Sequence, residues 1–172
     1  MVIKKEKTMS LISMLQQCER KNKPVRVGLI GAGKFGSMFL AQIPNIPGMD
    51  LICIADFNLE NAKKNLNLVG WKPESYQAKS YEEAIKNRNT HLTQSWEEMI
   101  KRPEIDVVVE CTGNPIAAVE HCLAAFKEGK HVVNVTVEAD AFCGALLGAR
   151  AKEAGVQYSL AFGDQPALIC AW

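Results

Sequence analysis

The chain has 172 residues, which is enough for one ordinary domain and too few for two. Its hydrophobic fraction of 48% and charged fraction of 23% are typical of a globular protein. The net charge of +1 creates no field that would attract nucleic acid or an anionic membrane, so we expect neither as a partner. No stretch approaches the roughly 18 uninterrupted apolar residues of a membrane span, and residues 1–7 lack the apolar run of a secretory signal.

The six cysteines are scattered through the chain. None forms a Cys-x-x-Cys pair, and no group of histidines and cysteines has the spacing of metal ligands, so no metal site is predicted. Cys53 and Cys111 stand within apolar, strand-like runs, where a cysteine acts as a small hydrophobic residue. This use of cysteine is typical of a reducing, cytoplasmic environment.

The apolar pattern alternates between strands and helices along the chain. Strands are expected at residues 25–30, 51–55, 90–93, 105–111, 131–135 and 156–161. The first helix is expected at residues 10–17, and the second is expected to follow the loop 31–36 and to end near Pro44. In this second helix, Phe35, Met38, Phe39 and Ile43 form the predicted apolar face.

Polar residues mark where the remaining helices begin. Asn58 is a predicted N-cap, and Ser80 with Glu83 and Ser95 with Glu98 have the spacing of capping boxes. Asn114 followed by proline predicts a helix with the apolar stripe Ile116, Val119, Leu123 and Phe126, ended by Gly129. Asp140 is the predicted N-cap of a helix that runs to Glu153.

Continuous apolar strands are buried on both faces, which requires helices above and below a mostly parallel sheet. The predicted fold is therefore α/β: a Rossmann-type, doubly wound, mostly parallel six-stranded sheet with helices on both faces. We assign residues 25–162 to this domain and residues 1–24 to an N-terminal tail and helix.

A glycine-rich loop, Gly31-x-Gly33-x-x-Gly36, follows the first strand. Gly31 permits the tight turn, Gly33 lets a pyrophosphate approach the backbone, and Gly36 lets the helix pack on the strand. The amides at the start of that helix suit phosphates, so the loop predicts a dinucleotide site. The candidate contacts in this loop are Gly31, Ala32, Gly33, Lys34, Phe35 and Gly36.

An acid stands at the end of the second strand, as the fingerprint requires. Asp56 follows Gly36 by 20 residues (56 − 36) and is predicted to accept hydrogen bonds from the adenosine ribose. An acid there disfavours a 2′-phosphate, and no arginine occurs at positions 57–62, which favours NAD over NADP. Lys63 or Lys64 could still accommodate NADP, and the alternative for Asp56 is a helix cap.

A second loop is predicted to lie beside the glycine loop, where ligands bind in folds of this kind. The residues of this loop suit contact with the nicotinamide ribose or with phosphates: Cys111, Thr112, Gly113, Asn114 and Pro115. Asn114 has the alternative role of a helix cap. Glu138 lies past the fifth strand and is the remaining candidate. His91, His121 and His131 are poor catalytic candidates and are interpreted as surface or partly buried side chains, so no catalytic residue is assigned.

Four segments in this order carry a family resemblance: residues 27–33, 107–113, 129–133 and 163–166. The chain resembles the NAD-binding half of homoserine dehydrogenase-like oxidoreductases. Within these, it is most similar to the branch whose members end in a SAF domain and which includes deoxyxylulose-phosphate-reductoisomerase-like enzymes. The resemblance implies hydride transfer between the nicotinamide of NAD or NADP and a small carbonyl or alcohol substrate.

The resemblance also has a departure and a limit. Homoserine dehydrogenases proper carry Asn-Lys shortly after Gly-Lys-His-Val-Val, whereas Val137 stands near the place of that lysine here, so homoserine oxidation is not expected. Family members continue into a substrate and oligomerisation domain, and residues 163–172 read as its truncated start. We therefore expect a fragment that is inactive alone, from a protein that is a homo-oligomer at full length.

Two other functions are compatible with a glycine loop followed by an acid. The first is a dinucleotide-binding regulatory module without catalysis, although no basic stripe for DNA accompanies it. The second is a methyltransferase, which the complete Gly-x-Gly-x-x-Gly disfavours.

Overall fold

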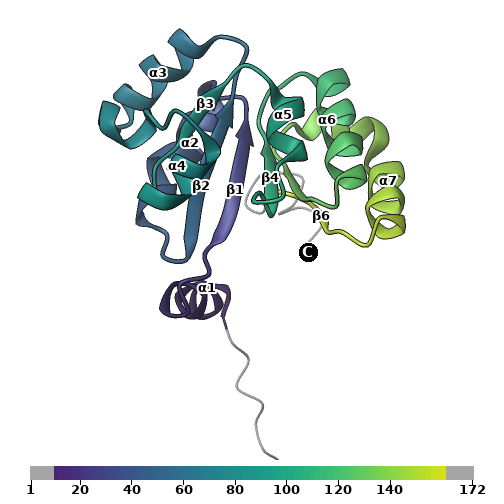
Figure 1. Cartoon of the computed structure of the whole chain (residues 1–172). Helices are drawn as coiled ribbons and strands as arrows, with labels where there is room; N and C mark the ends of the chain where they lie inside the picture. The colour runs from purple at the N-terminus through teal and green to yellow at the C-terminus, as the bar shows by residue number, and fades with distance from the viewer. Residues whose placement is uncertain (1–9, 162–172) are drawn as a thin grey trace, which may run out of the picture.

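A computed structural model describes residues 10–161, and its centre is a parallel sheet (Figure 1). The six strands stand in the order β3-β2-β1-β4-β5-β6, and every pairing is parallel. This is the doubly wound order of dinucleotide-binding folds, so the predicted fold is confirmed. The strands are β1 (Val25–Ile30), β2 (Met49–Ala55), β3 (His91–Thr93), β4 (Val107–Glu110), β5 (His131–Asn134) and β6 (Tyr158–Leu160).

Helices connect the strands and begin close to the predicted caps. Two short 3-10 helices, η1 (Ile43–Asn45) and η2 (Pro73–Tyr76), accompany them. The α-helices are α1 (Leu11–Arg20), α2 (Lys34–Gln42), α3 (Leu59–Leu68), α4 (Tyr81–Asn87), α5 (Trp96–Lys101), α6 (Pro115–Lys127) and α7 (Val137–Glu153). Among residues 10–161, no helix is long and apolar enough to cross a membrane.

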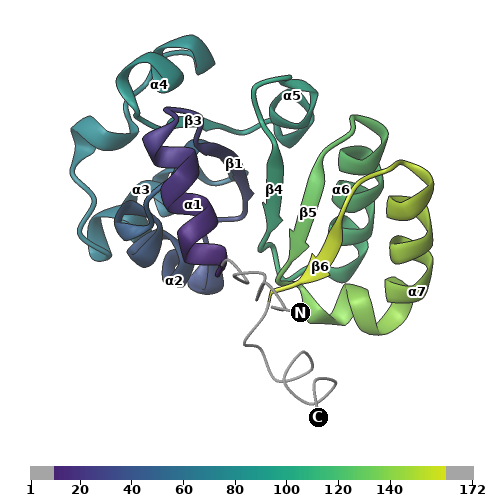
Figure 2. The same cartoon turned by 90° about the horizontal axis from the view of Figure 1, so that it is seen from below.

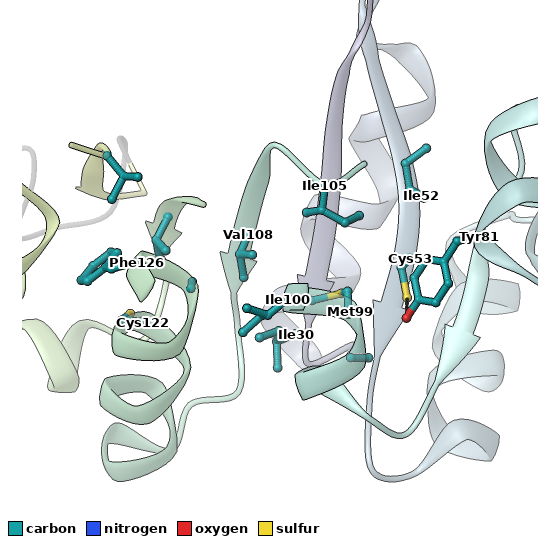
Figure 3. Close-up of a cluster of buried hydrophobic side chains, with 14 of the residues drawn as sticks. Ile30, Ile52, Cys53, Tyr81, Met99, Ile100, Ile105, Val108, Cys122 and Phe126 are labelled. Carbon is teal, nitrogen blue, oxygen red and sulfur yellow. Dashed lines mark hydrogen bonds between the residues drawn. The ribbon is translucent and has the colours of Figure 1, made fainter. Parts of the chain in front are cut away.

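Each face of the sheet carries its own buried cluster. One cluster joins the strands to α4, α5, α6 and α7; Figure 3 shows part of it, including Met99, Cys122 and Phe126. The other joins the strands to α2 and α3 through Leu40 and Leu66. Figure 2 shows α6 and α7 together on one side of β4, β5 and β6. Helices on both faces explain why the strands are apolar without alternation.

The capping serines behave only partly as predicted. Ser80 and Ser95 accept hydrogen bonds from the N–H groups of Glu83 and Glu98 at 3.2 and 3.1 Å, as N-caps do. The Glu83 carboxylate, however, accepts from the Lys79 N–H, one residue earlier than a capping box requires. The N–H of Ser95 donates to Thr93 Oγ1 instead of Glu98. Both sites are single caps because Lys79 and Thr93, which precede the two helices, take part in the hydrogen bonds that a capping box would require.

The start of α7 and the apolar faces of two helices differ from prediction. The N-cap of α7 is Thr136, so Asp140 lies inside the first turn and is not the cap. Phe35 and Met38 are 59% and 60% exposed, and Ile116 is 82% exposed, because other residues of the same helices face the sheet. In α2 these are Gly36 and Leu40, and in α6 they are Ala118, Cys122 and Ala125. The predicted Ile43 and Phe126 are buried.

The helix α1 lies outside the sheet and contacts the turn before β2 (Figure 1). Its Glu19 carboxylate accepts from the Gly48 N–H at 3.0 Å and pairs with the Arg88 guanidinium at 2.9 Å. Arg88 also pairs with Asp50 at 2.8 Å. These contacts attach α1 to the edge of the domain. The start of that domain at residue 25 stays a prediction. The predicted final segment, 163–172, lies outside the described residues.

Candidate functional site

Two loops meet at the carboxyl ends of β1 and β4, the central pair of strands. Helix connections leave these strands toward opposite faces of the sheet, and this topological switch point is where ligands bind in open α/β folds. Gly31 has φ +90°, and a Cβ there would stand 2.9 Å from the backbone of Cys111. Gly31 is therefore required both by its left-handed backbone and by the second loop against it.

The three glycines of the first loop face different surroundings. A Cβ on Gly36 would lie 2.2 Å from the carbonyl oxygen of Gly31, so the start of α2 can approach the strand only with glycine there. A Cβ on Gly33, in contrast, would meet nothing within 4 Å. Gly33 has φ −74°, an ordinary value for any residue, so the structure alone does not demand glycine at this position. The open space is what the approach of a pyrophosphate to the backbone would require.

The first turn of α2 keeps its amides available. Gly33 is the N-cap and supplies no side-chain hydrogen bond, whereas Ser10, Asn58, Ser80, Ser95 and Asn114 cap their helices through side-chain oxygens. A helix N-terminus with free amides carries a partial positive charge and suits an anion. Lys34 and Phe35, on this first turn, are both exposed.

The acid after β2 is bound to the glycine loop. Asp56 Oδ2 accepts a hydrogen bond from the Ala32 N–H at 2.8 Å, and its Oδ1 accepts from the Asn58 N–H at 2.8 Å. Asn65, on α3, donates from Nδ2 to the Ala32 carbonyl at 2.7 Å. Each carboxylate oxygen has a second lone pair, so Asp56 can still accept from a hydroxyl. Asn58 caps α3, and Asp56 does not.

The backbone N–H groups of the second loop already have hydrogen-bond acceptors within the protein. The Gly113 N–H donates to Thr136 Oγ1 at 3.0 Å, and the Asn114 N–H donates to Thr112 Oγ1 at 3.2 Å. Asn114 Oδ1 accepts from the N–H groups of Ile116 and Ala117, as predicted for the cap of α6. Thr112, Gly113 and Asn114 are exposed beside the glycine loop. The loop therefore lies where predicted but offers few backbone donors.

A buried carboxylate lies behind this second loop. Glu110, at the end of β4, has no exposed surface, and its Oε1 accepts from the Thr112 N–H at 3.2 Å and the Thr112 hydroxyl at 2.5 Å. Its Oε2 accepts from the Thr136 hydroxyl. Oε1 also lies 3.2 Å from Nδ1 of His121, whose ring is 4.6 Å from that of Trp96. His121 is 5% exposed, so its predicted placement at or near the surface was wrong.

Cys111 can take part only through its backbone. Its side chain belongs to the buried cluster under α2 and α3. Burial, followed by the charge of Glu110, raises the pKa of its thiol to about 12. A thiol that keeps its proton is a poor nucleophile, so Cys111 is a packing residue.

The predicted residues past β5 divide into two groups. Glu138 is exposed in the first turn of α7, where a negative charge is favourable beside the helix N-terminus. Asp140 Oδ1 accepts from the Tyr158 hydroxyl at 2.9 Å, and that hydroxyl oxygen accepts from Asn134 Nδ2 at 3.1 Å. Asp140 therefore ties α7 to β6, and Glu138 has a helix-stabilising role that needs no ligand.

Sequence reasoning missed three residues of this region. Asn65, Glu110 and Thr136 contact the two loops. The contacts of Asn65 with Ala32, of Glu110 with Thr136 and of Thr136 with Gly113 join residues 33, 26 and 23 positions apart in the chain. The only available signal was an acid within the apolar run 107–111, since a buried carboxylate must find partners. No group of three or more potential metal ligands occurs within the part of the chain that the structure describes.

The strand order, the open Gly33 and the acid beside the glycine loop together define a dinucleotide-binding Rossmann domain. Comparison with protein families agrees: residues 25–134 match the model of the oxidoreductase family with an NAD-binding Rossmann fold, Gfo/Idh/MocA. The chain belongs to this family.

The chain is also similar to parts of individual proteins. The chain is 29% identical over 108 residues to 4-carboxy-2-hydroxymuconate-6-semialdehyde dehydrogenase of Sphingobium sp. (strain NBRC 103272 / SYK-6), covering 63% of this chain and 28% of that protein. Among solved structures, it is similar to a homoserine dehydrogenase from Thiobacillus denitrificans, with TM-score 0.63 and 25% identity over 80% of this chain and 29% of that one. A biliverdin reductase from Synechocystis sp. PCC 6803, in complex with biliverdin and NADP+, gives TM-score 0.56 and 25% identity over 81% of this chain and 38% of that one. The chain thus spans about a third of the length of these relatives.

Proposed function

We propose that the chain is the cofactor-binding part of an oxidoreductase that passes hydride between nicotinamide and a small carbonyl or alcohol. The observation that carries this proposal is the contrast between Gly33 and Gly36: only Gly36 is required by packing, whereas Gly33 faces open space. Gly33 also stands at the N-terminus of α2 in the crevice, where a ligand that approaches the backbone would account for a glycine that packing does not require. The bound cofactor would supply the hydride chemistry, and the chain would supply binding and orientation.

Each part of the dinucleotide has candidate contacts in the described residues. The backbone from Gly31 to Gly36 and the amides of α2 suit the pyrophosphate. Asp56 suits the adenosine ribose hydroxyls, because both of its oxygens retain acceptor capacity. The loop from Thr112 to Pro115 suits the nicotinamide half, since it lies across the switch point from the glycine loop.

We propose NAD as the preferred cofactor. A 2′-phosphate would face the carboxylate of Asp56, and like charges repel. Lys63, one of the two lysines that could offset this, pairs with Glu60 at 2.7 Å. Lys64 is exposed and remains available for NADP.

The described residues do not identify the substrate. Because the chain spans about a third of its relatives, we propose that the remaining part positions the substrate and forms the homo-oligomer, and that this fragment is inactive alone. Similarity to a homoserine dehydrogenase supports the resemblance to that group, and the SAF-containing, reductoisomerase-like branch is our finer proposal within it. A regulatory module without catalysis is the alternative.

The test is a titration of the purified chain with NADH and NADPH, followed by nicotinamide fluorescence. Gly33→Val is expected to abolish binding while leaving the fold intact, because its side chain enters the space assigned to the pyrophosphate. Gly148→Val is the matched control, since a Cβ on Gly148 also meets nothing within 4 Å but lies on α7. Failure of the folded wild-type chain to bind either nucleotide would refute the proposed function for this chain.

A further inference from the structure

The side chain of Glu110 sets the direction of two threonine hydroxyls. The hydroxyl of Thr112 donates to Oε1 and that of Thr136 donates to Oε2, so both hydroxyl protons point toward Glu110. The remaining lone pairs of the two hydroxyls then accept the N–H groups of Asn114 and Gly113. One buried carboxylate thereby fixes the acceptors of the Gly113 and Asn114 amides in the loop between β4 and α6.

This pattern decides what the loop can offer to a ligand. The amides of Thr112, Gly113 and Asn114 all have acceptors inside the protein. Within residues 10–161, the carbonyl groups of Thr112 and Gly113 accept no hydrogen bond, although both residues are exposed. The loop therefore presents backbone acceptors rather than donors. A phosphate needs donors, whereas a sugar hydroxyl can donate to a carbonyl.

We infer that Glu110 is a positioning residue that makes the β4–α6 loop a site for the hydroxyls of the nicotinamide ribose and not for phosphate. Glu110 acts through Thr112 and Thr136 and touches no part of the cofactor itself. This inference rests on the proposed function, because it assigns a chemical role to one side of the same crevice. It also narrows the sequence-based expectation, which left ribose and phosphate open for this loop.

The experiment measures three ligands by calorimetric titration: ADP, ADP-ribose and NADH. ADP contains the adenosine and pyrophosphate alone, ADP-ribose adds the second ribose, and NADH adds the nicotinamide. Glu110→Gln replaces one acceptor oxygen with a donating NH2, so one threonine hydroxyl must turn its proton away from residue 110, which disturbs the hydrogen bonds that hold the loop. The expected result is unchanged affinity for ADP and a loss of about tenfold for both ADP-ribose and NADH, as for one hydrogen bond.

A second pair of variants keeps the test valid if Glu110→Gln does not fold. Thr136→Val removes the hydroxyl at nearly constant volume and should show the same selective loss, whereas Thr136→Ser retains the hydroxyl and should restore wild-type affinity. Thr90→Val is the matched control, because Thr90 is also a buried threonine, 2% exposed, whose hydroxyl donates to Leu51 O at 2.8 Å. It is expected to leave all three affinities unchanged.

The outcomes separate this inference from the proposed function. If the wild-type chain binds neither ADP nor NADH, the proposed function fails. If it binds them and the Glu110 and Thr136 variants weaken ADP as strongly as ADP-ribose, the role of Glu110 in the ribose site is wrong. Weakening of NADH alone, with ADP-ribose unchanged, would also overturn the ribose assignment.

Discussion

The carboxylate of Asp56 accepts a hydrogen bond from the backbone N–H of Ala32 at 2.8 Å, across 24 residues of sequence. The acid proposed to bind the adenosine ribose thus also holds the glycine loop in shape. The carbonyl group of Ala32 is also bound, because it accepts a hydrogen bond from Asn65 Nδ2. One side chain therefore couples the geometry of the glycine loop to the proposed recognition of the ribose.

Asp56→Asn should weaken both the fold and the cofactor site. An asparagine has one acceptor oxygen, whereas the amides of Ala32 and Asn58 donate to different oxygens of Asp56. Loss of one of these partly exposed hydrogen bonds is expected to lower the free energy of unfolding by about 1 kcal/mol. NADH affinity should fall by about tenfold or more, and the preference for NADH over NADPH should shrink, as measured by fluorescence titration.

Asn65→Ala is the control for this prediction, because it releases the carbonyl of Ala32 without removing an acid. It should lower stability by about 1 kcal/mol and leave the ratio of the NADH and NADPH affinities unchanged. An unchanged ratio in Asp56→Asn would show that this acid does not select the cofactor.

Gly36→Ala and Gly33→Ala should differ sharply in stability. The Cβ of Gly36→Ala would overlap the Gly31 carbonyl at 2.2 Å, so α2 must move away from β1. We expect a loss of about 1–3 kcal/mol in urea unfolding, as for other overpacked sites. Gly33→Ala meets no atom within 4 Å and should unfold at the wild-type midpoint or slightly higher. Equal midpoints for the two variants would contradict the packing described for Gly36.

Asn114→Ala tests whether the second loop has a role beyond capping. Its Oδ1 caps α6 through two amides, and loss of such a cap costs about 1 kcal/mol. Ser80→Ala removes the cap of α4, far from the crevice, and should cost about the same in thermal or urea unfolding. Only Asn114→Ala should also weaken NADH binding. If neither variant changes NADH affinity, Asn114 is a cap and nothing more.

The stability of the domain should fall at alkaline pH. Burial is the main cause that raises the pKa of Cys53, Cys111 and Cys122 from 9.0 to about 12. Between these values the folded state keeps protons that the unfolded chain releases, so the thiol contribution is complete below pH about 9 and is lost as pH rises toward about 12. Each thiol should reduce the free energy of unfolding by about 1.4 kcal/mol per pH unit in that window.

Urea unfolding at pH 8 and pH 10 measures this slope. Cys122→Ala is expected to be less stable than the wild type at pH 8 because it leaves a cavity, yet to lose less stability between the two pH values. The same pH dependence in both proteins would show that Cys122 does not carry a raised pKa.

The sequence predicted the strands and most helix starts because these depend on local patterns. Asn58, Asn114 and Gly129 mark boundaries through hydrogen bonds and backbone angles within a few residues. The prediction for Asp140 failed because Thr136 begins the helix four residues earlier and Tyr158, from a distant strand, takes the carboxylate. The exposed Phe35 and Ile116 show the same limit: periodicity does not say which face meets the sheet.

The sequence by itself determined the class of fold and the place of the glycine loop. Buried strands, a tight turn and a helix start each depend on residues that are close together in the sequence. Tertiary structure decided the roles within the crevice. Asp56 meets Ala32 across 24 residues, and Glu110 meets Thr136 across 26 residues. In each pair the two residues lie at the carboxyl ends of different strands, and only parallel pairing of the strands brings them together. A hydrogen bond acts over about 3 Å, so chemistry that depends on such contacts becomes visible only when the chain is folded.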